Sequence, residues 1–142
     1  MMSVPHNPPN APLHPLLIAA LLTLAVFVFT GAWLIVATAC TSRAGWMTLI
    51  AAAISITLLR VARMHPGTPR MLLAAFVTSA SIALGEWLVA ALPIAQQSNQ
   101  SPLEAAQRMG FDFGWMLIRL GNSPLDWGLI AVALVLAIRF SR

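Results

Sequence analysis

Four long runs of apolar residues constrain this chain of 142 residues more than any other feature of its sequence. A helix that crosses the hydrocarbon core of a bilayer, about 30 Å thick, needs about 20 mostly apolar residues. The first and third runs reach that length. The second and fourth end in arginines, whose head groups reach the interface while their stems stay in lipid. The sequence therefore predicts four membrane-spanning helices, at about 16–39, 44–60, 71–91 and 124–140.

The composition of the chain also indicates that it is surrounded by lipid. Hydrophobic residues make up 59% of the chain and charged residues 8%, whereas a typical soluble domain has about 25% charged residues. A surface so poor in charge has to face lipid, so we expect an all-α integral membrane protein with residues 16–142 as a single membrane domain. The segment 1–15 contains five prolines and neither lysine nor arginine. This predicts a disordered tail rather than a cleaved signal peptide.

The positions of the arginines predict the orientation in the membrane, because cytoplasmic loops carry an excess of positive charge. With a cytoplasmic N-terminus, five arginines face the cytoplasm: Arg60, Arg63, Arg70, Arg139 and Arg142. Three arginines face the other side: Arg43, Arg108 and Arg119. The five tryptophans fall near that other side, where aromatic residues often occupy the interface. All eight basic residues are arginine, as is typical of a GC-rich bacterial genome. We therefore expect a bacterial inner membrane and two cytoplasmic termini.

The segment between the third and fourth spans predicts one additional helix, at about 102–120. Ser101 and Glu104 have the spacing of a capping box, with Pro102 at the first helical position. Polar and apolar residues fall on opposite faces, so the helix is predicted to be amphipathic and to lie in the membrane interface. A lid, a partner-docking surface and a re-entrant segment are the alternative interpretations. The polar face, the predicted partner-facing surface, consists of Glu104, Arg108, Asp112, Trp115 and Arg119.

A second capping box is predicted at Ser123 and Asp126, directly before the fourth span. The additional helix and the fourth span are therefore expected to be separate helices with a tight joint at Gly121 and Asn122. Along the additional helix, opposite charges four residues apart are spaced for intrahelical ion pairs, each worth a few tenths of a kcal/mol.

Glu86 is the only acidic residue in the interior of a predicted span, because Asp126 belongs to the capping box at the start of the fourth. Ionisable residues inside a membrane are energetically costly, and they often mark pathways for protons, ions or substrates. Three interpretations remain open: Glu86 pairs with Arg108 or Arg119 and holds the additional helix on the bundle, it couples to a proton or substrate, or its head group reaches the interface. The predicted ion-pair or proton-coupling site therefore consists of Glu86, Arg108 and Arg119.

Small residues form a stripe along one side of the third span, at Ala74, Thr78, Ser81 and Gly85. Such stripes let membrane helices approach closely, and their hydroxyl groups form hydrogen bonds between helices. We expect this stripe to pack within the bundle or against another copy of the chain.

Motifs typical of enzymes, cofactor sites and metal sites are missing from the sequence, among them the phosphate-binding loop, the dinucleotide fingerprint, HExxH and paired cysteines. The spread of the arginines over loop ends leaves no basic groove for nucleic acid. We expect a non-enzymatic protein without cofactor or metal, whose partners are the lipid bilayer and another membrane protein or a second copy. The favoured interpretation is an accessory, assembly or immunity-type protein; the alternative is a small proton-coupled transporter or permease that uses Glu86.

Overall fold

The computed structural model describes residues 14–40, 45–65 and 67–141. Helices account for 87% of these residues, and no strand occurs among them, which confirms the predicted all-α class. The helices are α1 (Pro15–Cys40), α2 (Met47–Val61), α3 (Thr68–Ser98), α4 (Pro102–Arg108), α5 (Phe111–Gly121) and α6 (Pro124–Phe140). Residues 1–13 of the predicted disordered tail lie outside the described residues, as do Arg43 and Arg142.

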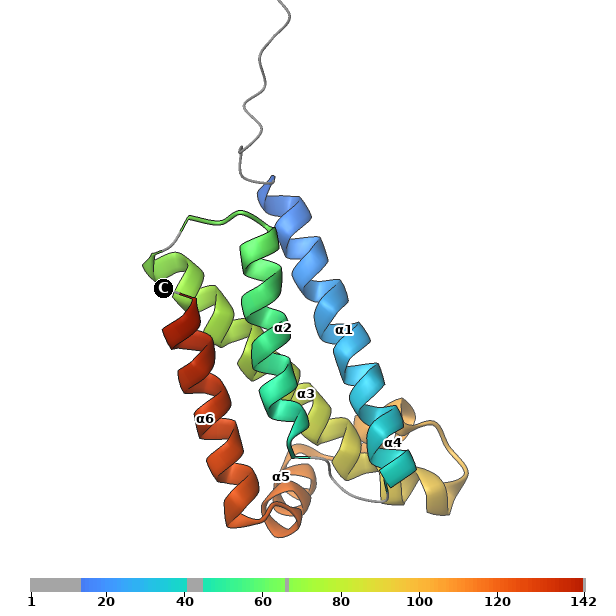
Figure 1. Ribbon diagram of the computed structural model, residues 1–142. Helices are drawn as coiled ribbons and strands as arrows, with labels where there is room; N and C mark the ends of the chain where they lie inside the picture. Colours follow the sequence, from blue (N-terminus) through green and yellow to red (C-terminus); the bar gives the residue numbers. More distant parts are fainter. Residues whose placement is uncertain (1–13, 41–44, 66, 142) are drawn as a thin grey trace, which may run out of the picture.

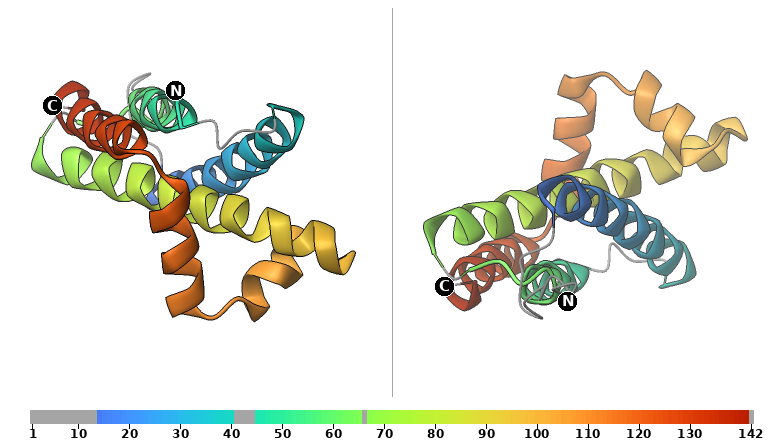
Figure 2. Two further views of the ribbon diagram at one scale, coloured as in Figure 1. Left: turned by 90° about the horizontal axis from the view of Figure 1, so that it is seen from below. Right: turned by 90° about the horizontal axis from the view of Figure 1, so that it is seen from above.

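Helix α3 is the central element, because it contacts each of the other five described helices. Helices α1, α2 and α6 run alongside it, while α4 and α5 lie across the end of the bundle where α3 finishes (Figure 1). In the views along the bundle, α1 and α3 cross, and α5 points away from the longer helices (Figure 2). In the described residues, α1, α2 and α6 therefore pack on α3, and the short helices α4 and α5 lie at one end.

Small residues on α3 allow its neighbours to come close, as the stripe in the sequence predicts. Ala74, Thr78, Ser81 and Gly85 are all buried. At Gly85, the indole ring of Trp33 from α1 occupies the space that a Cβ atom would take. Trp33 is 0% exposed, so it belongs to the core of the described helices. Since lipid gives helices no hydrophobic reason to associate, such close packing determines how α1 sits on α3.

Two or three membrane spans are supported by the described helices, whereas the sequence predicts four. Helices α1 and α3 are each long and apolar enough to cross a membrane, and α5 with α6 forms a third candidate that bends by 103° at its break. Helix α2 has 15 residues, about 22 Å of helix, which is shorter than the hydrocarbon core. The chain is therefore a membrane-associated protein, and the four-span bundle is not confirmed.

The prediction of one helix over 102–120 is wrong, because the chain forms α4 and α5 there. The break comes at Met109, where φ is −75° and ψ is 93°, and at Gly110, which precedes the first residue of α5. Met109 is buried in a cluster with alanines of α3 and α4. The bend thus turns an apolar side chain inward and places Arg108 and Asp112 on different helices, so they do not form the intrahelical pair expected of one continuous helix.

Both predicted capping boxes are present. Ser101 Oγ accepts a hydrogen bond from the backbone N–H of Glu104 at 3.3 Å, and the Glu104 carboxylate accepts one from the backbone N–H of Ser101 at 3.2 Å. The same exchange occurs at α6, where Ser123 N–H donates to Asp126 Oδ2 at 2.9 Å. Each box satisfies backbone N–H groups that the first turn of a helix leaves without partners. The starts of α4 and α6 are therefore specified locally by the sequence.

One end of the bundle carries the start of α1, the connection between α2 and α3, and the end of α6 (Figure 1). Arg60 at the end of α2 donates a hydrogen bond to the carbonyl oxygen of Phe140 at 3.4 Å. Arg70 on α3 donates to the carbonyl oxygen of Met64 at 3.3 Å. Arginine side chains therefore connect the chain segments that meet at this end, which is the end opposite α4 and α5.

Replacing Gly85 with alanine is expected to displace Trp33, because the added methyl group would overlap carbon atoms of the indole ring. We expect a loss of about 1–3 kcal/mol in the free energy of unfolding, which is typical of overpacking a core. The measurement is the midpoint of thermal unfolding in mild detergent. Gly31→Ala is the matched control, since no atom lies within 4 Å of its Cβ position. Equal midpoints for the two variants would contradict the structural role of the Gly85–Trp33 contact.

Candidate functional site

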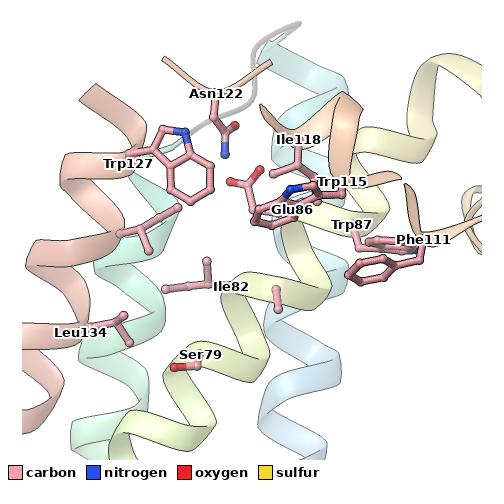
Figure 3. Close-up of a pocket in the computed structure, with 12 residues that line it drawn as sticks. Ser79, Ile82, Glu86, Trp87, Phe111, Trp115, Ile118, Asn122, Trp127 and Leu134 are labelled. Carbon is pink, nitrogen blue, oxygen red and sulfur yellow. The ribbon is translucent and has the colours of Figure 1, made fainter. Parts of the chain in front are cut away.

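A cavity of about 290 Å³ lies in the angle between α3, α5 and α6. Its walls are mostly apolar and aromatic, with few polar side chains (Figure 3). Ser79, Ile82 and Glu86 of α3 contribute to the lining, as do Trp115 and Ile118 of α5 and Trp127 of α6. A largely apolar hollow with a few converging polar groups is the usual form of a site for a small molecule.

Glu86 provides the carboxyl group of this cavity. It lies about 27 Å along α3 from Thr68, at 1.5 Å per residue, within a helix of about 46 Å. Its neighbour Gly85 receives Trp33 of α1, while the Glu86 carboxyl group points toward α5 and α6 (Figure 3). Glu86 is 4% exposed. The same turn of α3 therefore packs against α1 and presents the buried acid to the cavity.

Asn122 supplies a second polar side chain, and sequence reasoning missed it as a site residue. It lies between the last residue of α5 and Ser123, which caps α6, and its backbone N–H donates to the carbonyl oxygen of Ile118 at 3.0 Å. Its side chain points into the cavity toward Glu86 (Figure 3), and the residue is 8% exposed. Its position in the tight joint between two helix ends was the available signal, because the chain has to turn there.

Three tryptophans form aromatic walls of the cavity. The sequence predicts an interfacial position for all three, and a place on the partner-facing surface for Trp115. Trp115 and Trp127 meet edge to face, with ring centroids 6.3 Å apart and planes at 68°. Trp87 stacks on Phe111 at 5.9 Å, and its indole N–H donates to the carbonyl oxygen of Ala106 at 3.3 Å. Trp87 therefore contacts residues of α4 and α5 from its place on α3, while Trp115 and Trp127 line the cavity together with Glu86 (Figure 3).

The other predicted site residues lie elsewhere on α4 and α5. Arg108 lines a hollow that includes Met109 and Phe113, and Arg119 lines another with Asp112. Neither arginine lines the cavity of Glu86. The ion pair between Glu86 and one of these arginines therefore stays a prediction, and the structure places Asn122 opposite Glu86 in the cavity instead.

The predicted partner-facing surface is divided by the break between α4 and α5. Glu104 and Arg108 belong to α4, while Asp112, Trp115 and Arg119 belong to α5. All five side chains are exposed, but the Glu104 carboxylate is also bound to Ser101 in the capping box. Only the part on α5 forms a continuous group, where Asp112, Trp115 and Arg119 line one shallow hollow.

The polar groups of the cavity suit binding better than metal coordination. Within the described ranges, no group of three His, Cys, Asp or Glu side chains is placed to hold a metal ion. The cavity offers a carboxyl group, an amide and the hydroxyl group of Ser79. Together these groups can accept hydrogen bonds, exchange a proton or neutralise a positive charge.

Replacing Gly114 with alanine is expected to disturb the cavity wall, because the new Cβ would lie 2.6 Å from a carbon atom of the Trp87 indole ring. Trp87 has to shift to relieve this overlap, and the shift disturbs its stacking on Phe111. We expect a shift of the tryptophan emission maximum and a loss of about 1–3 kcal/mol in the free energy of unfolding. Gly110→Ala is the control, because its Cβ position has no neighbour within 4 Å. An unchanged emission spectrum in Gly114→Ala would show that Trp87 does not depend on this close approach.

Comparison with known proteins gives no further assignment: no model of a protein family matches the chain, and no curated protein or solved structure resembles it significantly. The function has to be argued from the geometry of the cavity and from the membrane setting of the helices.

Proposed function

We propose that this chain is a small polytopic membrane protein that binds a small amphipathic molecule in the Glu86 cavity, as a permease or carrier does. One observation carries the proposal: a buried carboxyl group faces a cavity of about 290 Å³ whose walls are otherwise mostly apolar. An ionisable residue held inside a membrane protein at an energetic cost is by default a functional residue. The proposal corresponds to the alternative hypothesis from the sequence, a small proton-coupled transporter or permease that uses Glu86.

The two ends of the cavity differ in polarity, and this difference favours an amphipathic ligand. Glu86 and Asn122 lie at the end next to the joint between α5 and α6. Ile82 and Leu134 lie further along α3 and α6, where the hydroxyl group of Ser79 is the polar group (Figure 3). On the same stretch of α3, Ala83 is exposed on the surface of the bundle. A molecule with a polar head and an apolar body therefore fits the cavity in one orientation and reaches it from the bilayer.

The proposed topology has four spans in a bacterial inner membrane, with both termini in the cytoplasm. Support comes from the arrangement of the helix ends, because α1 begins and α6 ends at the same end of the bundle (Figure 1). The four described arginines at this end satisfy the positive-inside rule; they are Arg60, Arg63, Arg70 and Arg139. In this orientation the 103° bend lays α5 along the outer interface, and the Glu86 cavity opens near that interface.

Proton coupling is the mechanism that Glu86 makes available to such a permease. A carboxyl group that binds either a proton or a ligand, but not both at once, links the movement of the two across the membrane. Asn122 opposite Glu86 can hydrogen-bond to either protonation state of the carboxyl group, because its amide both donates and accepts. The cavity thus contains the minimum set of groups for an exchange of a proton against a ligand.

The proposal is tested with 2,2,2-tribromoethanol, a small neutral amphipath whose heavy atoms quench tryptophan fluorescence. In lipid nanodiscs the wild type is expected to show saturable quenching, because Trp115 and Trp127 line the cavity. Ala83→Phe fills the mouth of the cavity with an aromatic ring and is expected to weaken the apparent affinity about tenfold, or about 1.4 kcal/mol.

Ala131→Phe is the matched control for this experiment. Ala131 is exposed on α6 and does not line the cavity, so the same substitution there should leave the quenching curve unchanged. Quenching that rises linearly with probe concentration in the wild type, without saturation, would refute a ligand site at Glu86.

A second candidate function is the one first expected from the sequence, an accessory, assembly or immunity-type protein that acts through a membrane-protein partner or a second copy. The observation in its favour is the exposure of α5, of which only Gly114 and Ile118 are buried. The shallow hollow with Asp112 and Arg119 gives this helix a charged surface of both signs next to exposed apolar side chains.

The second candidate predicts that a cross-linked complex depends on the arginines near this surface. Arg108→Ala combined with Arg119→Ala is expected to weaken the complex about tenfold, since arginines in a contact often contribute more than 1 kcal/mol. Arg139→Ala, at the opposite end of the bundle, is the control. A complex that survives the double substitution, measured by quantitative mass spectrometry after cross-linking, would rule out this surface.

A further inference from the structure

The charge of the cavity lining narrows the class of ligand. Among the residues that line the cavity, Glu86 is the one acidic residue and none is basic. Glu86 is 4% exposed and sits deep in the wall. A positively charged ligand is attracted by the carboxylate, whereas an anionic ligand is repelled by it and finds no basic side chain in the lining. The electrostatic complement of the cavity is therefore a cation.

An inorganic cation does not match the polar groups that the cavity supplies. Calcium takes six to eight oxygen ligands and magnesium demands a near-ideal octahedral set, while the side-chain oxygens here come from Glu86, Asn122 and Ser79. No cluster of metal-binding side chains occurs elsewhere in the described helices and loops. The complementary cation thus has to bring its own apolar surface to fill the remainder of the cavity.

The aromatic walls suit an organic cation in particular. A cation is attracted to the face of an aromatic ring within about 6 Å of its centroid, and tryptophan gives the strongest attraction. Trp115 and Trp127 line the cavity together with Glu86, and their rings meet edge to face with planes at 68° (Figure 3). Two rings that meet at such an angle form a corner, and a charged group placed in that corner can contact a face of each ring.

The opposite part of the cavity is mainly apolar, with the hydroxyl group of Ser79 as its polar group, and it receives the body of the ligand. Ile82 of α3 and Ile130 and Leu134 of α6 line it, and the volume of about 290 Å³ suits a molecule the size of a substituted benzene ring. Trp87 does not compete for the charge, because it is stacked on Phe111 and bound to the carbonyl oxygen of Ala106.

We propose that the cavity binds a hydrophobic organic cation, such as a quaternary ammonium compound, with its charge beside Glu86 in the corner formed by Trp115 and Trp127 and its apolar body against α6. This inference rests on the proposed function and adds the chemical class of the ligand. It makes the carboxylate and the two indole rings the determinants of specificity.

The test compares benzyltrimethylammonium with neopentylbenzene, which has the same shape but carries carbon in place of the charged nitrogen. Each compound is titrated into protein in nanodiscs, and its affinity is read from displacement of 2,2,2-tribromoethanol. In the wild type the cation is expected to bind about tenfold more tightly than its neutral isostere, once both are corrected for partition into lipid. Glu86→Gln keeps the size of the side chain and should abolish that preference.

Trp127→Phe provides a second variant if Glu86→Gln fails to fold, and it should reduce the cation preference because phenylalanine is the weaker partner for a cation. Trp46→Phe is its control, since Trp46 is exposed before α2 and does not line the cavity. Equal affinities for the two compounds in the wild type, together with saturable quenching by tribromoethanol, would overturn the cation inference and leave the ligand site standing. Absence of saturable quenching would overturn both.

Discussion

The close contact between Gly85 and Trp33 is the packing interaction on which the arrangement around α3 depends. In a bilayer, apolar side chains gain little by leaving lipid for protein, so helices associate where their surfaces fit closely. The missing side chain of Gly85 lets the Trp33 indole reach the backbone of α3, and Trp33 becomes fully buried. Because Glu86 follows directly, the contact with α1 also fixes the direction in which the buried carboxyl group points.

A second contact of the same kind places α5. Gly114 lets Trp87 of α3 lie against the backbone of α5, and the hydrogen bond from Trp87 to Ala106 ties the same side chain to α4. Two glycine–tryptophan contacts therefore position the turn of α3 that carries Glu86 and Trp87, one with α1 and one with α5. This explains why a helix as exposed as α5 still contributes a defined wall.

The parts of this fold that could be predicted from the sequence are those specified by local patterns. Apolar runs located the four longer helices, and the residues of the two capping boxes located the starts of α4 and α6. The stripe of small residues on α3 was recognised as a packing surface for the same reason, since its spacing follows the helical period.

The parts that could not be predicted depend on contacts between distant segments. The break at Met109 follows from burying its side chain against α3, which no local propensity encodes. The complete burial of Trp33 depends on its contact with Gly85, a residue of another helix. Asn122 was recognised as part of a joint, but its role in the cavity follows from the 103° bend that turns it toward Glu86. Glu86 stands out in the sequence as a lone acid in an apolar run, and its place in the cavity wall follows from the packing of α5 and α6.

The unequal lengths of the helices have a consequence for the lipid around the protein. Helix α3, with 31 residues, measures about 46 Å, while α2 and α6, with 15 and 17, measure about 22 and 26 Å. Helices α2 and α6 contact each other. Under the proposed topology, the side of the molecule that they form is therefore shorter than the hydrocarbon core of an ordinary bilayer. Hydrophobic mismatch of this kind thins the adjacent membrane. Since α6 borders the Glu86 cavity, the headgroup layer would dip toward its mouth, and membrane thickness would regulate access to the buried acid.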